Sequence, residues 1–224
     1  MNITHAVAEE IIKDKLCTIF DRQKELMAKY HDIEKRGGLL QTEDCPVNLD
    51  DKRGQARIKD FAWRLTEEVG EALDALYADN DVEHFNEELV DGLHFLTELT
   101  ILAGLEPWDV AQLVVKKEDS GDYLDDICQC VKELEGKEQV GSSWLCWATT
   151  TLIRRLGMMC NTLKNKPWKQ SHMRTDVEAF KGKLGEVWEI YIHILVNSLG
   201  NAEDIADIYL KKSQVNKFRQ RSNY

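Results

Sequence analysis

The chain has 224 residues, of which 43% are hydrophobic, and this is enough apolar material for the core of one domain or of two small ones. A formal net charge of -11, from 40 acidic and 29 basic residues, argues against a nucleic-acid or anionic-membrane binder, because both need excess positive charge. The six cysteines form no CxxC pair, and no stretch is typical of a signal peptide or a membrane span, so we expect free thiols and a cytoplasmic protein.

Helical periodicity runs through nearly the whole sequence, and no segment alternates apolar and polar residues in the manner of a strand. Only three prolines occur, Pro46, Pro107 and Pro167, and each falls where a helix has to start or stop. These features predict an all-α fold, a helical bundle. The helices expected in chain order span residues 6–35, 58–77, 82–103, a segment opening at 107, 123–134, 144–161, 177–198 and 202–219.

Two stretches of the sequence resemble each other weakly. An apolar helix followed by a glycine-containing turn occurs at residues 89–110 and again at residues 184–205. This pattern suggests a degenerate internal repeat of a two-helix unit. We expect a single domain over residues 1–224, with acidic motifs in a first half of about 1–110 and a basic motif in a second half of about 111–224.

Two acidic pairs lie on consecutive predicted helices, Glu68-Val-Gly-Glu71 on the first and Glu88-Leu-Val-Asp91 on the next. A spacing of three residues puts both carboxylates of a pair on one helix face, and the short turn between the helices favours packing side by side. Four close carboxylates repel one another unless cations lie among them, and hard oxygen ligands suit Mg²⁺, with Mn²⁺ as a second possibility. A solvated acidic face is the alternative for either pair alone.

A basic motif lies in the last predicted helix. Lys212, Asn216 and Arg219 follow one another at spacings of four and three residues, so they share one helix face. Lysine and arginine side chains suit phosphate oxygens, and an asparagine amide can match the edge of a pyrimidine base. A basic helix end that only complements the helix dipole is the alternative for this motif.

Together these motifs resemble the dimeric-type dUTPases and the related phage dCTP/dUTP pyrophosphatases, which belong to the all-α nucleoside triphosphate pyrophosphatases. Gln23 resembles the amino-terminal glutamine of the family, and the segment Asp91-Gly-Leu-His94-Phe95 resembles its D-x-x-H-F motif. The ending that starts at Lys212 resembles KxxxNxxRQ with a tyrosine, Tyr224, a few residues later. The resemblance covers residues 20–224, although residues 111–165 add little to it.

The resemblance implies roles for the matching residues. Those implied to hold Mg²⁺ are Glu68, Glu71, Glu88 and Asp91. Among them, Glu68 is implied to orient or deprotonate the attacking water. The residues implied to contact the substrate are Gln23, Trp63, His94, Phe95, Lys212, Asn216, Arg219 and Tyr224. Phe95 would pack where a 2′-hydroxyl would lie, which favours deoxynucleotides, whereas Trp63 could equally belong to the core and His94 could equally be a structural histidine.

The activity implied is Mg²⁺-dependent hydrolysis of dUTP to dUMP and pyrophosphate by a homodimer in the cytoplasm, or in the host cytoplasm if a phage encodes the chain. Hydrolysis of dCTP, alone or with dUTP, is the nearest alternative. The carboxy-terminal motif argues against a broader MazG-like pyrophosphatase. A helical interaction protein without catalytic activity is an alternative from another functional class. Leu26-Met27 stands where dimeric dUTPases commonly have Leu-Asn, so strict selectivity for uracil is not implied.

Overall fold

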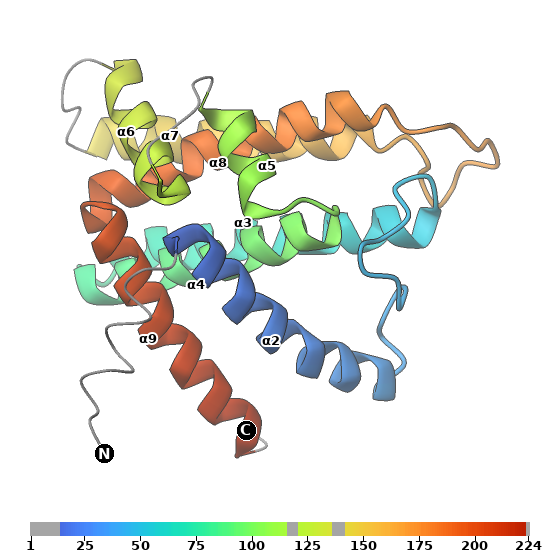
Figure 1. Cartoon of the computed structure of the whole chain (residues 1–224), viewed down its shortest axis with the longest axis horizontal. Coiled ribbons are helices and arrows are strands. Elements are labelled where there is room, and N and C mark those ends of the chain that lie inside the picture. The colour runs from blue at the N-terminus through green and yellow to red at the C-terminus, as the bar shows by residue number, and fades with distance from the viewer. Residues whose placement is uncertain (1–13, 116–120, 136–141, 223–224) are drawn as a thin grey trace.

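The computed structural model describes residues 14–115, 121–135 and 142–222 (Figure 1). These residues form eight α-helices and no strand, which confirms the predicted all-α fold. The helices are α2 (Lys15–Arg36), α3 (Lys52–Tyr77), α4 (Val82–Leu102), α5 (Pro107–Val114), α6 (Tyr123–Glu135), α7 (Ser142–Thr162), α8 (Val177–Leu199) and α9 (Ala202–Arg221).

The helices pack in layers around one core. α3 packs along α4, and α8 packs along α7, while α2 and α9 lie against each other and against α4 on the opposite side from α8 (Figure 1). A single cluster of buried apolar side chains takes members from all eight described helices. The expected internal repeat pairs α4–α5 with α8–α9, but α5 has 8 residues and α9 has 20, so the two units differ in their second helix.

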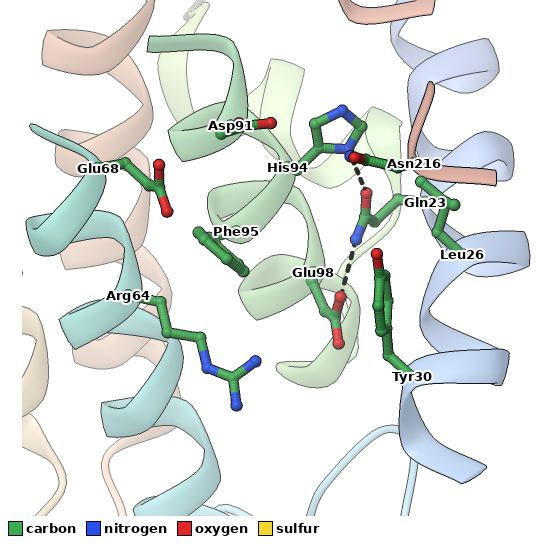
Figure 2. A pocket seen from close by; sticks show the side chains of 10 residues that line it. All are labelled: Gln23, Leu26, Tyr30, Arg64, Glu68, Asp91, His94, Phe95, Glu98 and Asn216. Atoms are coloured by element: carbon green, nitrogen blue, oxygen red, sulfur yellow. Dashed lines mark hydrogen bonds between the residues drawn. The ribbon is translucent and has the colours of Figure 1, made fainter. Parts of the chain in front are cut away.

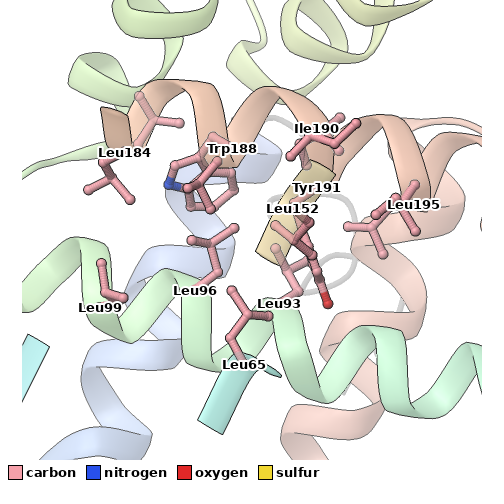
Figure 3. Close-up of a cluster of buried hydrophobic side chains, with 14 of the residues drawn as sticks. Leu65, Leu93, Leu96, Leu99, Leu152, Leu184, Trp188, Ile190, Tyr191 and Leu195 are labelled. Carbon is pink, nitrogen blue, oxygen red and sulfur yellow. The ribbon is translucent and has the colours of Figure 1, made fainter. Parts of the chain in front are cut away.

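Two aromatic side chains of α8 join the layers (Figure 3). Trp188 is fully buried, stacks on Phe20 of α2 with ring centroids 6.3 Å apart, and donates from Nε1 to Oγ1 of Thr100 at 2.9 Å. The hydroxyl of Tyr191, also fully buried, donates to the carbonyl oxygen of Leu89 in α4 at 2.7 Å. These bonds satisfy the polar atoms of both rings, so the core holds them without an unpaired donor.

A glycine lets three helices approach one another next to the second acidic motif. A Cβ atom on Gly92 of α4 would lie 2.1 Å from the hydroxyl oxygen of Tyr191 and 3.0 Å from Cδ1 of Leu65 in α3. No side chain fits there without moving the buried tyrosine. The close contact of α3, α4 and α8 therefore requires a glycine at the position after Asp91.

Two helix starts differ from the sequence prediction. The first described helix begins at Lys15, where the side chain of Asp14 accepts from the backbone N–H of Cys17 at 2.8 Å, whereas the predicted start at residue 6 lies outside the described residues. α3 begins six residues before the predicted start at 58, because the Asp51 carboxylate caps it by accepting from two backbone N–H groups. Pro107 opens α5 as predicted.

Two predictions from composition can be compared with the structure. All six cysteines are free thiols. None of the described helices combines the length and the apolar character needed to cross a membrane.

Candidate metal and nucleotide site

Three carboxylates from two neighbouring helices come together. Glu68 and Glu71 of α3 and Glu88 of α4 each offer an oxygen, and these oxygens all lie within 4.8 Å of one another. Burial raises the pKa of Glu68 to about 8, and a hydrogen bond with Glu88 and the charges of Asp91, Glu88 and Glu71 add to this rise. His84 lies beside this group, with its Nε2 2.7 Å from Oε1 of Glu88, but the raised pKa of Glu68 indicates that the carboxylate charge still exceeds what nearby groups offset. A group of hard oxygen donors with this excess charge fits Mg²⁺ or Mn²⁺.

The fourth predicted ligand, Asp91, is paired with a cation of the chain. Its Oδ2 lies 2.8 Å from Nζ of Lys212 in α9, and that nitrogen also lies 3.5 Å from Glu87. Burial raises the pKa of Asp91, although the Lys212 ammonium opposes the rise. Burial alone would lower the pKa of Lys212, but its hydrogen bond to Asp91 and the nearby carboxylates raise it. The acidic motif of α4 and the basic motif of α9 therefore meet in space.

A cavity of about 270 Å³ opens beside the acidic group, between α2, α3, α4 and α9 (Figure 2). Six of its lining residues were predicted as site residues: Gln23, Glu68, Asp91, His94, Phe95 and Asn216. Four others were missed by sequence reasoning: Leu26, Tyr30, Arg64 and Glu98. The cavity is continuous with the acidic group, because Glu68 belongs to both.

One side-chain amide organises the inner wall of the cavity. Gln23 Nε2 lies 2.8 Å from Oε2 of Glu98, and Gln23 Oε1 lies 2.8 Å from both the Tyr209 hydroxyl and Nδ1 of His94. A carboxylate can only accept, so the Gln23 amide has to turn its NH₂ group toward Glu98. Gln23 Oε1 then accepts from Tyr209 and from His94, which fixes the proton of His94 on Nδ1.

His94 is a neutral component of this network. Burial lowers its pKa to about 3, and the charge of Lys212 adds to this. Its ring stacks on that of Tyr209 with centroids 4.0 Å apart. His94 therefore positions Gln23 and carries no positive charge at neutral pH. This geometry is compatible with a purely structural role for His94, and His94 also lines the cavity.

Arg64 and Glu98 could have been found by helical spacing. Arg64 lies four residues before Glu68, and Glu98 lies four residues after His94, so each falls on a helix face that already carried a predicted site residue. The Arg64 guanidinium pairs with Glu34 at 2.8 Å and lies 5.9 Å from the ring centroid of Phe95. The sequence did not show how deep these two charged side chains lie, because an isolated charge on a helix is usually exposed.

The remaining predicted substrate residues lie outside this cavity or beyond the described chain. Trp63 is 62% exposed, donates from Nε1 to Glu67 at 2.7 Å, and is not among the lining residues. Arg219 is exposed on α9, although its charge acts on Asp91. Tyr224 lies outside the described residues. Lys212 is not among the lining residues, but it pairs with Asp91, which is.

An all-α fold with an oxygen-rich acidic group beside a cavity and a basic helix is the arrangement expected of an all-α nucleoside triphosphate pyrophosphatase. Comparison with protein-family models matches residues 15–224 to the dUTPase family, and the chain belongs to this family, the dimeric-type all-α dUTPases. Membership supports a nucleoside triphosphate pyrophosphatase activity of the dUTP/dCTP type. A search of curated proteins and a search of solved structures each found no match.

Proposed function

We propose that the chain is an Mg²⁺-dependent enzyme of cytoplasmic pyrimidine deoxynucleotide metabolism that hydrolyses dUTP, dCTP or both to the monophosphate and pyrophosphate. The observation that supports this most is the direct continuity of two sites. A carboxylate group suited to divalent cations shares Glu68 with a cavity whose inner wall carries a fixed amide, a neutral histidine and a phenylalanine. A triphosphate and its base could occupy these two parts at once.

The acidic residues proposed to hold the metal are Glu68, Glu71, Glu88 and Asp91. Bound Mg²⁺ supplies positive charge against the roughly four negative charges of a triphosphate. Lys212 and Arg219 would bind phosphate oxygens, and Tyr224 is proposed to join them. Lys212 pairs with Oδ2 of Asp91 at 2.8 Å, so a phosphate bound by Lys212 and a cation bound by Asp91 would lie next to each other.

The chain's own chemistry centres on Glu68. Its carboxylate is proposed to accept a proton from the attacking water. Burial and the neighbouring carboxylates raise its pKa to about 8 in the metal-free chain, and bound cations would keep it ionised. The water oxygen attacks the triphosphate, the bond between the α-phosphate and the β-phosphate breaks, and pyrophosphate leaves. Phe95 would pack against the deoxyribose, and Gln23 and Asn216 would bind the base. The part of Trp63 in substrate binding stays a prediction.

The test is pyrophosphate release from dUTP, dCTP, dTTP and UTP, with Mg²⁺ and with excess EDTA. We expect release from dUTP, dCTP or both with Mg²⁺, little from UTP, and none in EDTA. Replacing Glu88→Gln should reduce turnover at least about a hundredfold, whereas Glu83→Gln, an exposed position on the same helix, should leave it unchanged. Tight nucleotide binding without turnover in the unchanged protein would instead support a binding protein.

We also propose that the enzyme is a homodimer, and this rests on its family. Light scattering after size-exclusion chromatography should give twice the mass of 25.8 kDa that one chain has. A mass of one chain at micromolar concentration would contradict this.

A further inference from the structure

Glu98 is a buried carboxylate at one end of the cavity, and it has unused capacity to accept hydrogen bonds. It is 3% exposed, and its Oε2 accepts from Gln23 at 2.8 Å. Its Oε1 lies 3.4 Å from His31 Nε2 and 3.9 Å from Arg57 Nη2, and accepts no hydrogen bond from the described residues. Oε1 is covered by the surrounding side chains, but a carboxylate offers about four lone-pair positions, so Glu98 can still accept from a ligand in the cavity that it lines.

The arginines near Glu98 are engaged by closer partners. Arg57 lies 2.6 Å from Glu34, and Arg64 lies 2.8 Å from Glu34 and 2.9 Å from Asp60. Two guanidinium groups thus face three carboxylates, those of Glu34, Asp60 and Glu98. Glu98 lies furthest from its nearest guanidinium, at 3.9 Å. A buried carboxylate in this position gains most from a ligand that brings a hydrogen-bond donor.

The position of Glu98 along α4 indicates which part of a nucleotide would reach it. Asp91 lies at the phosphate end of the cavity, Phe95 one turn further, and Glu98 two turns from Asp91, which is about 10 Å along the helix axis. A nucleotide with its phosphates at the acidic end and its deoxyribose against Phe95 would extend its base toward Glu98 (Figure 2). In a pyrimidine base, position 4 lies opposite the ring nitrogen that carries the sugar, so the substituent at position 4 lies furthest from the sugar and nearest to Glu98.

The neighbouring amide cannot replace Glu98 as an acceptor. Gln23 Oε1 already receives the Tyr209 hydroxyl and His94 Nδ1–H, so its only spare group is one N–H of its NH₂. Gln23 and Glu98 therefore offer one donor and one anionic acceptor side by side, next to the Tyr30 hydroxyl, which can donate or accept. Cytosine offers the complementary pair, the acceptor N3 beside the amino group at position 4.

We propose that Glu98 reads position 4 of the base by accepting from the exocyclic amino group of cytosine, and that the site therefore prefers dCTP to dUTP. The carbonyl oxygen that uracil carries at position 4 would face the carboxylate as acceptor against acceptor, which is repulsive. Thymine carries the same oxygen and is disfavoured in the same way. This inference rests on the proposed function, because it names the base within the same site.

The first test uses the unchanged protein and a series of bases that differ only at position 4. Pyrophosphate release is measured with dCTP, dUTP and the triphosphate of 2′-deoxyzebularine, which carries hydrogen at position 4. We expect kcat/KM for dCTP to exceed that for dUTP by about tenfold or more, with the zebularine nucleotide between them. Binding of the α,β-imido analogues of dCTP and dUTP, measured calorimetrically, should show the same order without turnover.

The second test uses a matched pair of variants. Glu98→Gln removes the charge and lets an amide N–H face the oxygen of uracil, so the dCTP-to-dUTP ratio of kcat/KM should move toward dUTP by about tenfold or more. Glu34→Gln makes the same chemical change beside the same arginine, but Glu34 does not line the cavity. The ratio should be unchanged in Glu34→Gln, even if both variants lose stability.

The outcomes separate the two proposals. If the unchanged protein uses dUTP as well as dCTP, or if both variants move the ratio equally, Glu98 does not read the base, while the proposed function stands. If no triphosphate releases pyrophosphate, the proposed function fails, and the binding of the two imido analogues still decides the base preference. If Glu98→Gln does not fold, the position-4 series with the unchanged protein decides alone.

Discussion

Glu68 is the residue at which the needs of the site and the stability of the metal-free fold oppose each other most. An unfolded chain would ionise this carboxyl at its ordinary pKa of 4.5, whereas the folded chain holds its proton up to about pH 8. The folded state therefore binds more protons than the unfolded state between these values, and its stability falls as the pH rises through that window. We predict that Glu68→Gln stabilises the metal-free protein at pH 8 while abolishing pyrophosphate release.

The size of this effect follows from the two pKa values. The interval between 4.5 and about 8, at about 1.36 kcal/mol for each pKa unit, sets a ceiling of about 5 kcal/mol. Glu68 is only half-buried, so water screens a large part of this penalty. A gain of about 1–2 kcal/mol in the free energy of unfolding is the expected result at pH 8.

Urea unfolding in EDTA, followed by far-UV circular dichroism, measures this gain at pH 5 and at pH 8. The difference between Glu68→Gln and the unchanged protein should be larger at pH 8. Glu67→Gln, an exposed neighbour on α3, is the control and should show no such dependence. Added Mg²⁺ should stabilise the unchanged protein more than Glu68→Gln. A variant that is less stable than the unchanged protein at pH 8 in EDTA would refute the reasoning.

Three further predictions concern the helices around the site. Gly92→Ala should lower the free energy of unfolding by about 2 kcal/mol or more, measured by urea titration, because the new methyl group displaces the Tyr191 hydroxyl. Lys212→Met should raise KM for the triphosphate at least about tenfold in steady-state assays, because a phosphate contact is lost; an unchanged KM would contradict the proposed contact. Burial lowers the pKa of His94 from 6.5 in the unfolded chain to about 3 in the folded chain. Below pH 6.5 the unfolded state therefore binds a proton that the folded state does not bind, and stability is lost as the pH falls. In His94→Gln, urea titrations between pH 7 and pH 4 should show a smaller loss, and an equal loss would contradict the buried neutral ring.

Local signals predicted most of the helices. Pro107 and the turn before Asp81 mark the starts of α5 and α4, and Asp81 caps α4 by accepting from the N–H of His84. The predicted start of α3 at residue 58 left Gly54 outside the helix, because the Asp, Pro and Gly residues before it are typical of a loop. Gly54 lies in the first turn of α3. A Cβ atom there would lie 2.2 Å from the carbonyl oxygen of Asn48, so only glycine allows the preceding loop to pack this closely on the helix.

The site was predictable where it depends on spacing within a helix, and less so where it depends on packing. The ExxE and ExxD spacings and the short turn between the two helices were enough to predict that Glu68, Glu71 and Glu88 lie close together. The pairing of Asp91 with Lys212 requires the direction in which α9 crosses α4, and spacing along a chain does not contain that direction. Glu98 was missed because its burial depends on the helices that surround it.

The contact between the first and last described helices has a consequence for how the protein is made. Gln220 donates to the carbonyl oxygen of Leu26 at 3.2 Å, and Lys29 donates to the carbonyl oxygen of Gln220. α9 also supplies Tyr209, which holds the Gln23 amide in place. In a nascent chain on the ribosome, α3 and α4 emerge well before α9, so the cavity lacks the wall that α9 supplies until residues 202–221 have emerged and docked.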